Sequence, residues 1–175
     1  SCELVKAARD RGIDAAFIPT GQTGIMIEGW GNPIDRVVSD FTAGAVEEMI
    51  LERGNDHDLL VVEGQGSIIH PAYSAVTCGI LHGAMADDLV LCHTAGREEV
   101  HGYDQRLPDP SAYVSLYEDL AAPVHETNVA AGSLNTSHLE ETRARREIQE
   151  FADSIDAPTS DPVRFGATKI LEAVI

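Results

Sequence analysis

Apolar and polar positions follow two different periods along this chain, and the two periods alternate. Short uninterrupted apolar runs predict buried strands, as at residues 59–62, where the sequence is Leu-Leu-Val-Val. Segments with apolar residues three and four apart predict helices, most clearly residues 138–155. Strands that alternate with helices are typical of βαβ units, so we predict an α/β fold with a mainly parallel sheet.

The same pattern places the individual elements. Strands are predicted at residues 14–19, 59–62, 88–93 and 129–135, and helices at 1–12, 41–53, 71–82, 110–120, 138–155 and 166–175. The glycine-rich stretch 20–31 is predicted to be a loop. Neither an internal repeat nor a low-complexity linker interrupts residues 1–175, so we predict one domain.

Charge narrows the class of partner. The 175 residues carry 29 Asp and Glu against 12 Lys and Arg, a formal net charge of −17. Such a chain repels a phosphate backbone, so we expect a small-molecule partner and no nucleic acid. Acids spread along the whole chain favour a protein adapted to molar salt over an ordinary acidic one.

Apolar runs are too short for a membrane span, which needs about 20 residues. We therefore expect no membrane partner and a cytoplasmic location, and we leave a homo-oligomer open. The 3 cysteines form no CxxC pair, and the 7 histidines include no pair with the spacing of a zinc protease helix. A disulfide framework and a transition-metal site are both disfavoured.

Three polar clusters follow directly on predicted strands, where open α/β sheets bind their ligands. The candidate binding residues are Thr20, Gly21, Gln22, Thr23, Gly24, Gly64, Gln65, Gly66, Ser67, Asn135 and Thr136. Glycines let backbone N–H groups approach a ligand closely, and hydroxyls and amides add donors. We expect a rim that binds an anion, either a carboxylate or a phosphate, although the first cluster alone is equally explained as a tight turn.

Three further residues are candidates for chemistry at this rim. Glu63 ends an apolar strand, a position suited to an acid that acts as a base or holds Mg²⁺ through water, and the alternative is a capping acid. His70 is a candidate acid or base, with a structural histidine as the alternative. Arg97 is a candidate clamp for an anion, with a surface ion pair to Glu98 or Glu99 as the alternative.

Several longer motifs together resemble one known family. They are the run TGQTGIMI at residues 20–27 with GWG at 29–31, VSDF at 38–41, VEGQGS at 62–67 with HP at 70–71, LCH at 91–93, NTS at 135–137 and DPVR at 161–164. They resemble the P-loop domain of proteins often encoded beside dipeptide epimerases, some of which are D-glutamate N-acetyltransferases. The acid loop after residue 62 is also distantly similar to that of dethiobiotin synthetase.

The resemblance implies a three-layer α/β/α fold with a mainly parallel sheet, similar to that of P-loop NTPases, with acetyl-CoA or ATP and Mg²⁺ as cofactors. It also implies a phosphate-binding loop before the first helix and a preceding Rossmann-like domain. The pattern G-x-x-x-x-G-K-[ST] does not occur in these residues, so we expect the chain to lack that loop and that domain.

The leading functional hypothesis is acetyl transfer from acetyl-CoA to the amino group of D-glutamate. Glu63 or His70 would be the base, and the backbone amides of residues 64–66 would stabilise the oxyanion. The alternatives are an ATP-dependent carboxylate-activating or phosphoryl-transfer enzyme, and a non-catalytic nucleotide- or metabolite-binding regulator.

Overall fold

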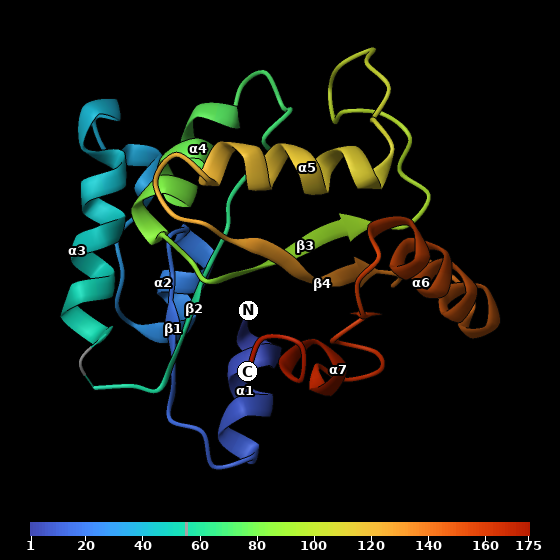
Figure 1. Ribbon diagram of the computed structural model, residues 1–175, viewed down its shortest axis with the longest axis horizontal. Helices are drawn as coiled ribbons and strands as arrows, with labels where there is room; N and C mark the ends of the chain where they lie inside the picture. Colours follow the sequence, from blue (N-terminus) through green and yellow to red (C-terminus); the bar gives the residue numbers. More distant parts are fainter. Residues whose placement is uncertain (55) are drawn as a thin grey trace. The chain divides into compact units, whose positions relative to one another are not determined.

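The computed structural model describes residues 1–54 and 56–175. These residues form two compact units, Ser1–Ala86 and Asp87–Ile175, and each is described by itself. Both units are parallel α/β structures (Figure 1).

The first unit is built on two parallel strands, β1 (Ala15–Ile18) and β2 (Leu59–Val62). Ala15 pairs with Leu59 and Ile18 pairs with Val62, and every residue of β1 is buried. Helix α1 (Cys2–Asp10) packs on β1 and buries an apolar stripe that includes Leu4 and Ala8. The apolar run of β1 is thus covered, whereas the four residues of β2 are half-buried and not buried as the apolar run at 59–62 predicted.

The other face of the first unit is closed by α3 (Thr42–Gly54) and α4 (Ser74–Ala84). Val46 and Met49 of α3 join Ile18 and Ile80 in the core. A side chain at Gly83 of α4 would lie 2.8 Å from Val46 Cβ, so the glycine permits the close approach of the two helices. The remaining elements are α2 (Gln22–Glu28) and two 3-10 helices, η1 (Ile34–Arg36) and η2 (Ser39–Phe41).

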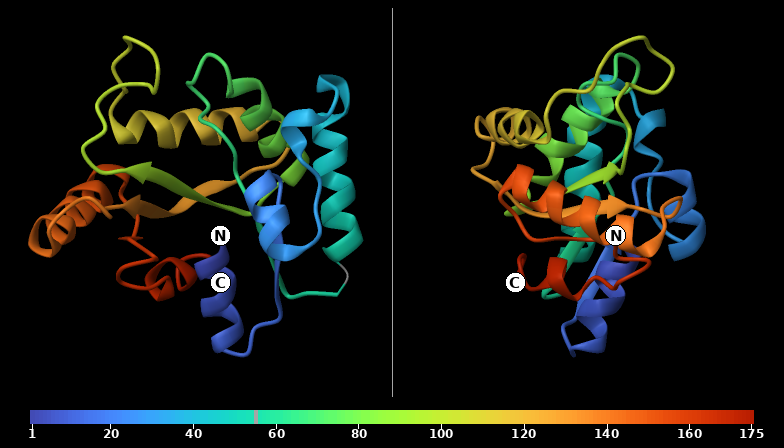
Figure 2. Two further views of the ribbon diagram at one scale, coloured as in Figure 1. Left: turned by 180° about the vertical axis from the view of Figure 1, so that it is seen from behind. Right: turned by 90° about the vertical axis from the view of Figure 1, so that its right-hand side faces the viewer.

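The second unit contains a three-stranded parallel sheet in the order β3 (Asp88–Thr94), β4 (Asn128–Asn135) and β5 (Thr159–Ser160). Helix α5 (Pro110–Ala121) and the short helix α7 (Thr168–Leu171) lie on opposite sides of its strands (Figures 1 and 2). Helix α6 (Glu141–Ile155) contributes Phe151 and Ile155 to a core that also contains Leu134 of β4.

The predicted parallel α/β class is confirmed, and the predicted strands and longer helices form within a few residues of their expected bounds. Residues 22–28 form a helix where a loop was predicted. The local pattern missed this helix because the chain at its start is held by Glu63, which is distant in sequence. The last helix covers only residues 168–171 of the predicted 166–175. The two-residue strand β5 is too short to leave a pattern in the sequence.

The described residues include no helix that is both long enough and apolar enough to cross a membrane.

Candidate functional site

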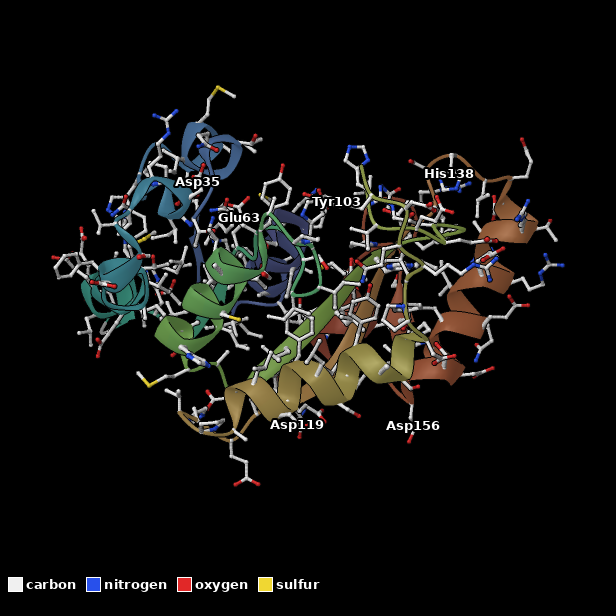
Figure 3. The ribbon with its side chains drawn as sticks, turned by 90° about the horizontal axis from the view of Figure 1, so that it is seen from above. Asp35, Glu63, Tyr103, Asp119, His138 and Asp156 are labelled. Carbon is white, nitrogen blue, oxygen red and sulfur yellow. The ribbon has the colours of Figure 1, made fainter. Side chains whose placement is uncertain are left out.

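The Glu63 carboxylate connects the loop that follows β2 to the loop that follows β1. Glu63 is labelled in Figure 3. Glu63 Oε2 accepts hydrogen bonds from the backbone N–H of Thr20 at 3.0 Å and of Gly21 at 2.9 Å. The Thr20 hydroxyl donates to the Glu63 carbonyl at 2.8 Å. Glu63 thus holds the chain in position where α2 begins, and the two polar clusters predicted at neighbouring strand ends are in direct contact.

The two oxygens of the Glu63 carboxylate differ in their hydrogen bonds. Oε1 accepts no hydrogen bond from any residue that the structure describes, while Oε2 accepts two. The side chain is half-buried. Its position therefore combines the structural role of a capping acid with an available oxygen.

Gln65 and Thr77 hold the second loop against its neighbours. Gln65 Nε2 donates to the Thr20 carbonyl, and the Thr77 hydroxyl of α4 donates to the Gln65 carbonyl at 2.8 Å. Gly66 has a φ of +63°, and a side chain there would lie 2.7 Å from Tyr73 Cβ. The loop is thus held by contacts with Thr20 and with Thr77. Gly66 adopts the left-handed backbone conformation that its turn requires and that favours glycine.

Gly24 allows α2 to lie directly against Glu63. A Cβ atom at Gly24 would lie 2.5 Å from Glu63 Oε2 and 2.9 Å from Pro19 Cβ. Gly24 and Gly21 are buried, whereas Gln22 and Thr23 are exposed. The Gln22 amide donates to the Asp35 carboxylate at 3.1 Å, so that side chain is engaged at the surface.

His70 is buried and packs beside the same loop. Its ring stacks on Tyr73 with a centroid distance of 4.2 Å, and its Nδ1 accepts from the Ala72 N–H at 3.2 Å. A neutral imidazole that accepts at Nδ1 carries its proton on Nε2. In this arrangement the neutral His70 ring is a hydrogen-bond donor through Nε2, while Nδ1 is occupied by the Ala72 N–H.

Backbone donors are available on the acid loop. The N–H groups of Gly64, Gln65, Gly66 and Ser67 donate no hydrogen bond to any residue in the described part of the chain. Gly64 and Gly66 are exposed, and Ser67 is half-buried. N–H groups held on a fixed loop are suited to bind a carboxylate or a developing oxyanion.

The third predicted cluster belongs to the second unit, at the end of β4. Thr136 is buried, and its N–H and hydroxyl donate to Asp161 Oδ2 at 2.9 and 2.7 Å. Asn135 Oδ1 accepts from the Ser137 N–H at 3.0 Å. Arg164 Nη1 donates to the carbonyls of Thr136 at 2.7 Å and of Leu139 at 2.8 Å. The Thr136 side chain therefore serves the internal structure of this unit.

The charge of Asp161 is stabilised inside the second unit. Burial by itself would raise the pKa of Asp161, but hydrogen bonds from Thr136, Arg164 and Val163 outweigh it and hold the pKa below its ordinary value. Asp161 is 3% exposed, so these donors replace water as its solvent.

Arg97 follows β3 and is exposed. Its backbone N–H donates to the Thr94 carbonyl at 3.3 Å. Within the described residues its guanidinium forms no ion pair with Glu98 or Glu99, which was the alternative interpretation of this residue. The guanidinium therefore remains available to an anion.

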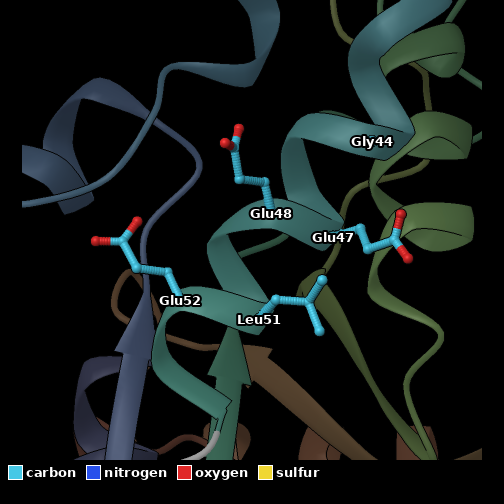
Figure 4. A pocket seen from close by; sticks show the side chains of 5 residues that line it. All are labelled: Gly44, Glu47, Glu48, Leu51 and Glu52. Atoms are coloured by element: carbon cyan, nitrogen blue, oxygen red, sulfur yellow. The ribbon is translucent and has the colours of Figure 1, made fainter.

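A surface hollow of about 540 Å³ lies on helix α3 of the first unit (Figure 4). It is lined by Gly44, Glu47, Glu48, Leu51 and Glu52. All five belong to α3, so the hollow is the exposed side of one helix and includes no candidate site residue.

A family model described as "Domain of unknown function (DUF1611_C) P-loop domain" matches residues 1–171. The chain belongs to this family. A solved DUF1611 protein from Anabaena variabilis is 39% identical and superposes with a TM-score of 0.95, covering 99% of this chain and 51% of that one. This likeness supports the P-loop-like α/β fold.

Two curated relatives of the DUF1611 chain carry the name D-glutamate N-acetyltransferase. The protein from Tritonibacter scottomollicae is 40% identical over 172 residues, which are 94% of this chain and 50% of that protein. The protein from a Pseudoalteromonas species is 34% identical over 174 residues, which are 98% of this chain and 52% of that protein. The DUF1611 chain thus spans about half the length of the curated relatives it matches.

No group of three or more His, Cys, Asp or Glu side chains is placed to hold a metal ion within the described residues of the DUF1611 chain.

Two residues that organise the end of β4, Asp161 and Arg164, were not among the residues predicted for the site. Their signal is the Asp-Pro-Val-Arg run, in which an Asp can accept from the N–H groups that follow it. Asp161 Oδ1 accepts hydrogen bonds from the N–H groups of Val163 at 3.1 Å and of Arg164 at 3.2 Å, as expected for such a turn.

Proposed function

We propose that this chain takes part in N-acetyl transfer to the amino group of D-glutamate, with acetyl-CoA as the donor. The observation that carries the proposal is the 34–40% identity, along nearly the whole chain, to two relatives that bear that name. The geometry of the Glu63 loop is compatible with the chemistry.

Amine acylation places two demands on a protein. The ammonium group of the amino acid must lose a proton before it can attack, and the oxyanion formed on the acyl carbon needs hydrogen-bond donors. Bound acetyl-CoA would supply the activated acetyl group as a thioester. The remaining steps fall to the residues of the chain.

Glu63 is the proposed base. Its Oε2 is held by two backbone N–H groups, and its Oε1 accepts none within the described residues, so the carboxylate is oriented with one oxygen available for a proton. His70, whose neutral ring carries its proton on Nε2 when Nδ1 accepts from Ala72, is the proposed hydrogen-bond donor to the leaving sulfur. The proton that Glu63 takes from the amine is the one that the departing CoA thiolate finally receives, so both residues return to their starting states.

The acid loop is the proposed oxyanion site. Its backbone N–H groups at Gly64 and Gln65 have no acceptor within the described residues, and Gln65 itself is held by Thr20 and Thr77. Donors fixed before the reaction stabilise a developing charge without reorganisation. These groups fit the carbonyl of an acyl donor.

The same carboxylate also fits Mg²⁺, which proteins often bind through one or two carboxylates and several waters. Glu63 Oε1 would be the ligand in an ATP-dependent reaction. That alternative predicts a requirement for ATP, which acetyl transfer lacks.

The test is an assay of the full-length protein with acetyl-CoA and either D-glutamate or L-glutamate. Release of the CoA thiol is followed with and without ATP and Mg²⁺. The proposal predicts thiol release that depends on D-glutamate and does not depend on ATP. Phosphate release that requires ATP, without loss of acetyl-CoA, would contradict it.

A further inference from the structure

His93 lies at the carboxyl end of β3, and Arg97 follows in the turn after that strand. Neither residue belongs to the Glu63 loop. The turn that connects them is fixed. The Arg97 N–H donates to the Thr94 carbonyl at 3.3 Å, and the Ala95 N–H donates to the Asn135 carbonyl at 3.1 Å. Both residues therefore have defined places at the edge of the sheet where parallel α/β structures bind ligands.

The His93 ring is oriented by packing alone. It stacks on Phe151 of α6 with a centroid distance of 5.6 Å and an angle of 2° between the rings. Neither ring nitrogen forms a hydrogen bond or an ion pair with a residue in the described part of the chain. No buried side-chain nitrogen or oxygen there lacks a hydrogen bond, so the ring nitrogens are within reach of solvent. The imidazole is half-buried and available on its polar edge.

Only one neighbour of His93 in this unit that the contacts identify is charged. The register of β4 places Leu134 beside it, α6 places Phe151 against its ring, and the turn after β3 supplies Arg97. Burial first, and then the positive charge of Arg97, lower the pKa of His93 below its ordinary value. Both effects favour the neutral form of the imidazole.

The surroundings of Arg97 differ from those of the arginines on α6. Arg143, Arg145 and Arg146 each pair with a glutamate one helical turn away. Arg97 forms no such pair within the described residues, although Glu98 and Glu99 follow it directly. An exposed guanidinium in a chain of net charge −17, beside an imidazole whose protonated form it disfavours, is arranged to receive an anion.

We propose that His93 and Arg97 form a binding site for the carboxylate of a small molecule. The Arg97 guanidinium presents paired N–H donors that match the two carboxylate oxygens. The neutral imidazole adds a hydrogen bond at its exposed edge. One guanidinium matches a single negative charge, whereas the adjacent Glu98 and Glu99 disfavour a phosphate dianion.

The assignment of this carboxylate to the amino-acid substrate rests on the proposed function. The existence of a carboxylate site at His93 and Arg97 does not depend on that function.

A bound carboxylate would offset the positive charge of Arg97. Binding and protonation of His93 are therefore coupled, and by reciprocity each favours the other.

The experiment is an NMR titration of the full-length protein with D-glutamate, acetate and inorganic phosphate as separate probes. The imidazole signals of His93, assigned by loss in His93→Gln, report its pKa and the dissociation constant. We expect D-glutamate to raise the pKa of His93 and Arg97→Gln to weaken binding at least tenfold. Arg97→Gln without ligand is also expected to raise that pKa, because the repelling charge is gone.

The matched control is Arg146→Gln, which removes the same charge from an exposed arginine of the same unit. It should leave both the pKa of His93 and the dissociation constant unchanged. Unchanged binding in Arg97→Gln, or a phosphate affinity above that of D-glutamate, would overturn the carboxylate site. Binding of D-glutamate without any acetyl transfer would contradict the proposed function and leave this site standing.

Discussion

Glu63 combines structure and proposed chemistry in one side chain, and two substitutions separate them. Glu63→Ala removes the acceptor for the N–H groups of Thr20 and Gly21, so we expect a loss of about 2 kcal/mol or more in the free energy of unfolding. Glu63→Gln keeps an acceptor and should cost less than about 1 kcal/mol. Urea unfolding followed by circular dichroism measures both.

Activity should respond to Glu63→Gln much more than stability does. The substitution removes the charge of the proposed base, and we expect turnover of the full-length protein to fall about 10²-fold. Glu48→Gln on the exposed part of α3 is the matched control and should leave turnover at the wild-type level. Wild-type turnover in Glu63→Gln would restrict Glu63 to its structural role.

Asp161 is predicted to make stability depend on pH. Its pKa is below its ordinary value of 3.8, so its contribution is fully present above about pH 4 and is lost as the pH falls through the lowered pKa. In Asp161→Asn, the amide NH₂ would face N–H donors, and we expect a loss of about 2 kcal/mol at pH 7.

The measurement is urea unfolding of Asp161→Asn and wild type at several pH values. The gap between them should narrow as the pH falls below about 4. Asp119→Asn, an exposed carboxylate on α5, should change stability by less than about 0.5 kcal/mol throughout. A gap that is the same at pH 7 and pH 3 would mean that the charge of Asp161 contributes nothing.

At the scale of elements, helix α2 depends on a glycine that leaves room for Glu63. In Gly24→Ala the new Cβ would lie 2.5 Å from Glu63 Oε2, so the helix or the carboxylate must move. We expect a loss of about 1–3 kcal/mol, the usual cost of overpacking. Gly44→Ala on α3 meets nothing within 4 Å and should be neutral or stabilising by up to about 1 kcal/mol. Thermal unfolding of the two variants gives the comparison.

Local pattern predicted the elements that pack along their whole length, and it missed those fixed by distant contacts. The half-buried strand β2 could be recognised from its continuous apolar run, and α6 from its helical apolar period. Helix α2 spans seven residues and includes a glycine, so its helical state depends on Glu63, which is about 40 positions away. The contact between the clusters after β1 and β2 could be predicted from the rule that parallel strands end at one edge. The hydrogen bonds of Asp161 could not.

At the scale of the whole molecule, the net charge of −17 predicts a response to salt. Like charges repel in the folded state, and the Debye length falls from about 8 Å at physiological salt to about 3 Å at 1 M. We expect the melting temperature to rise by several degrees or more between about 0.1 M and about 2 M KCl. Circular dichroism melts in chloride salts measure screening, since chloride is weakly excluded from surfaces compared with sulfate. A flat or falling melting temperature would contradict adaptation to salt.

The central claim is acetyl transfer to D-glutamate, and isotope transfer tests it most directly. The full-length protein is incubated with acetyl-CoA labelled with ¹³C in the acetyl group and with unlabelled D-glutamate, without ATP. Mass spectrometry then follows N-acetylglutamate. The account predicts labelled N-acetyl-D-glutamate, formed much more slowly from L-glutamate and by Glu63→Gln. No labelled product from a folded protein, with acetyl-CoA intact, would contradict it.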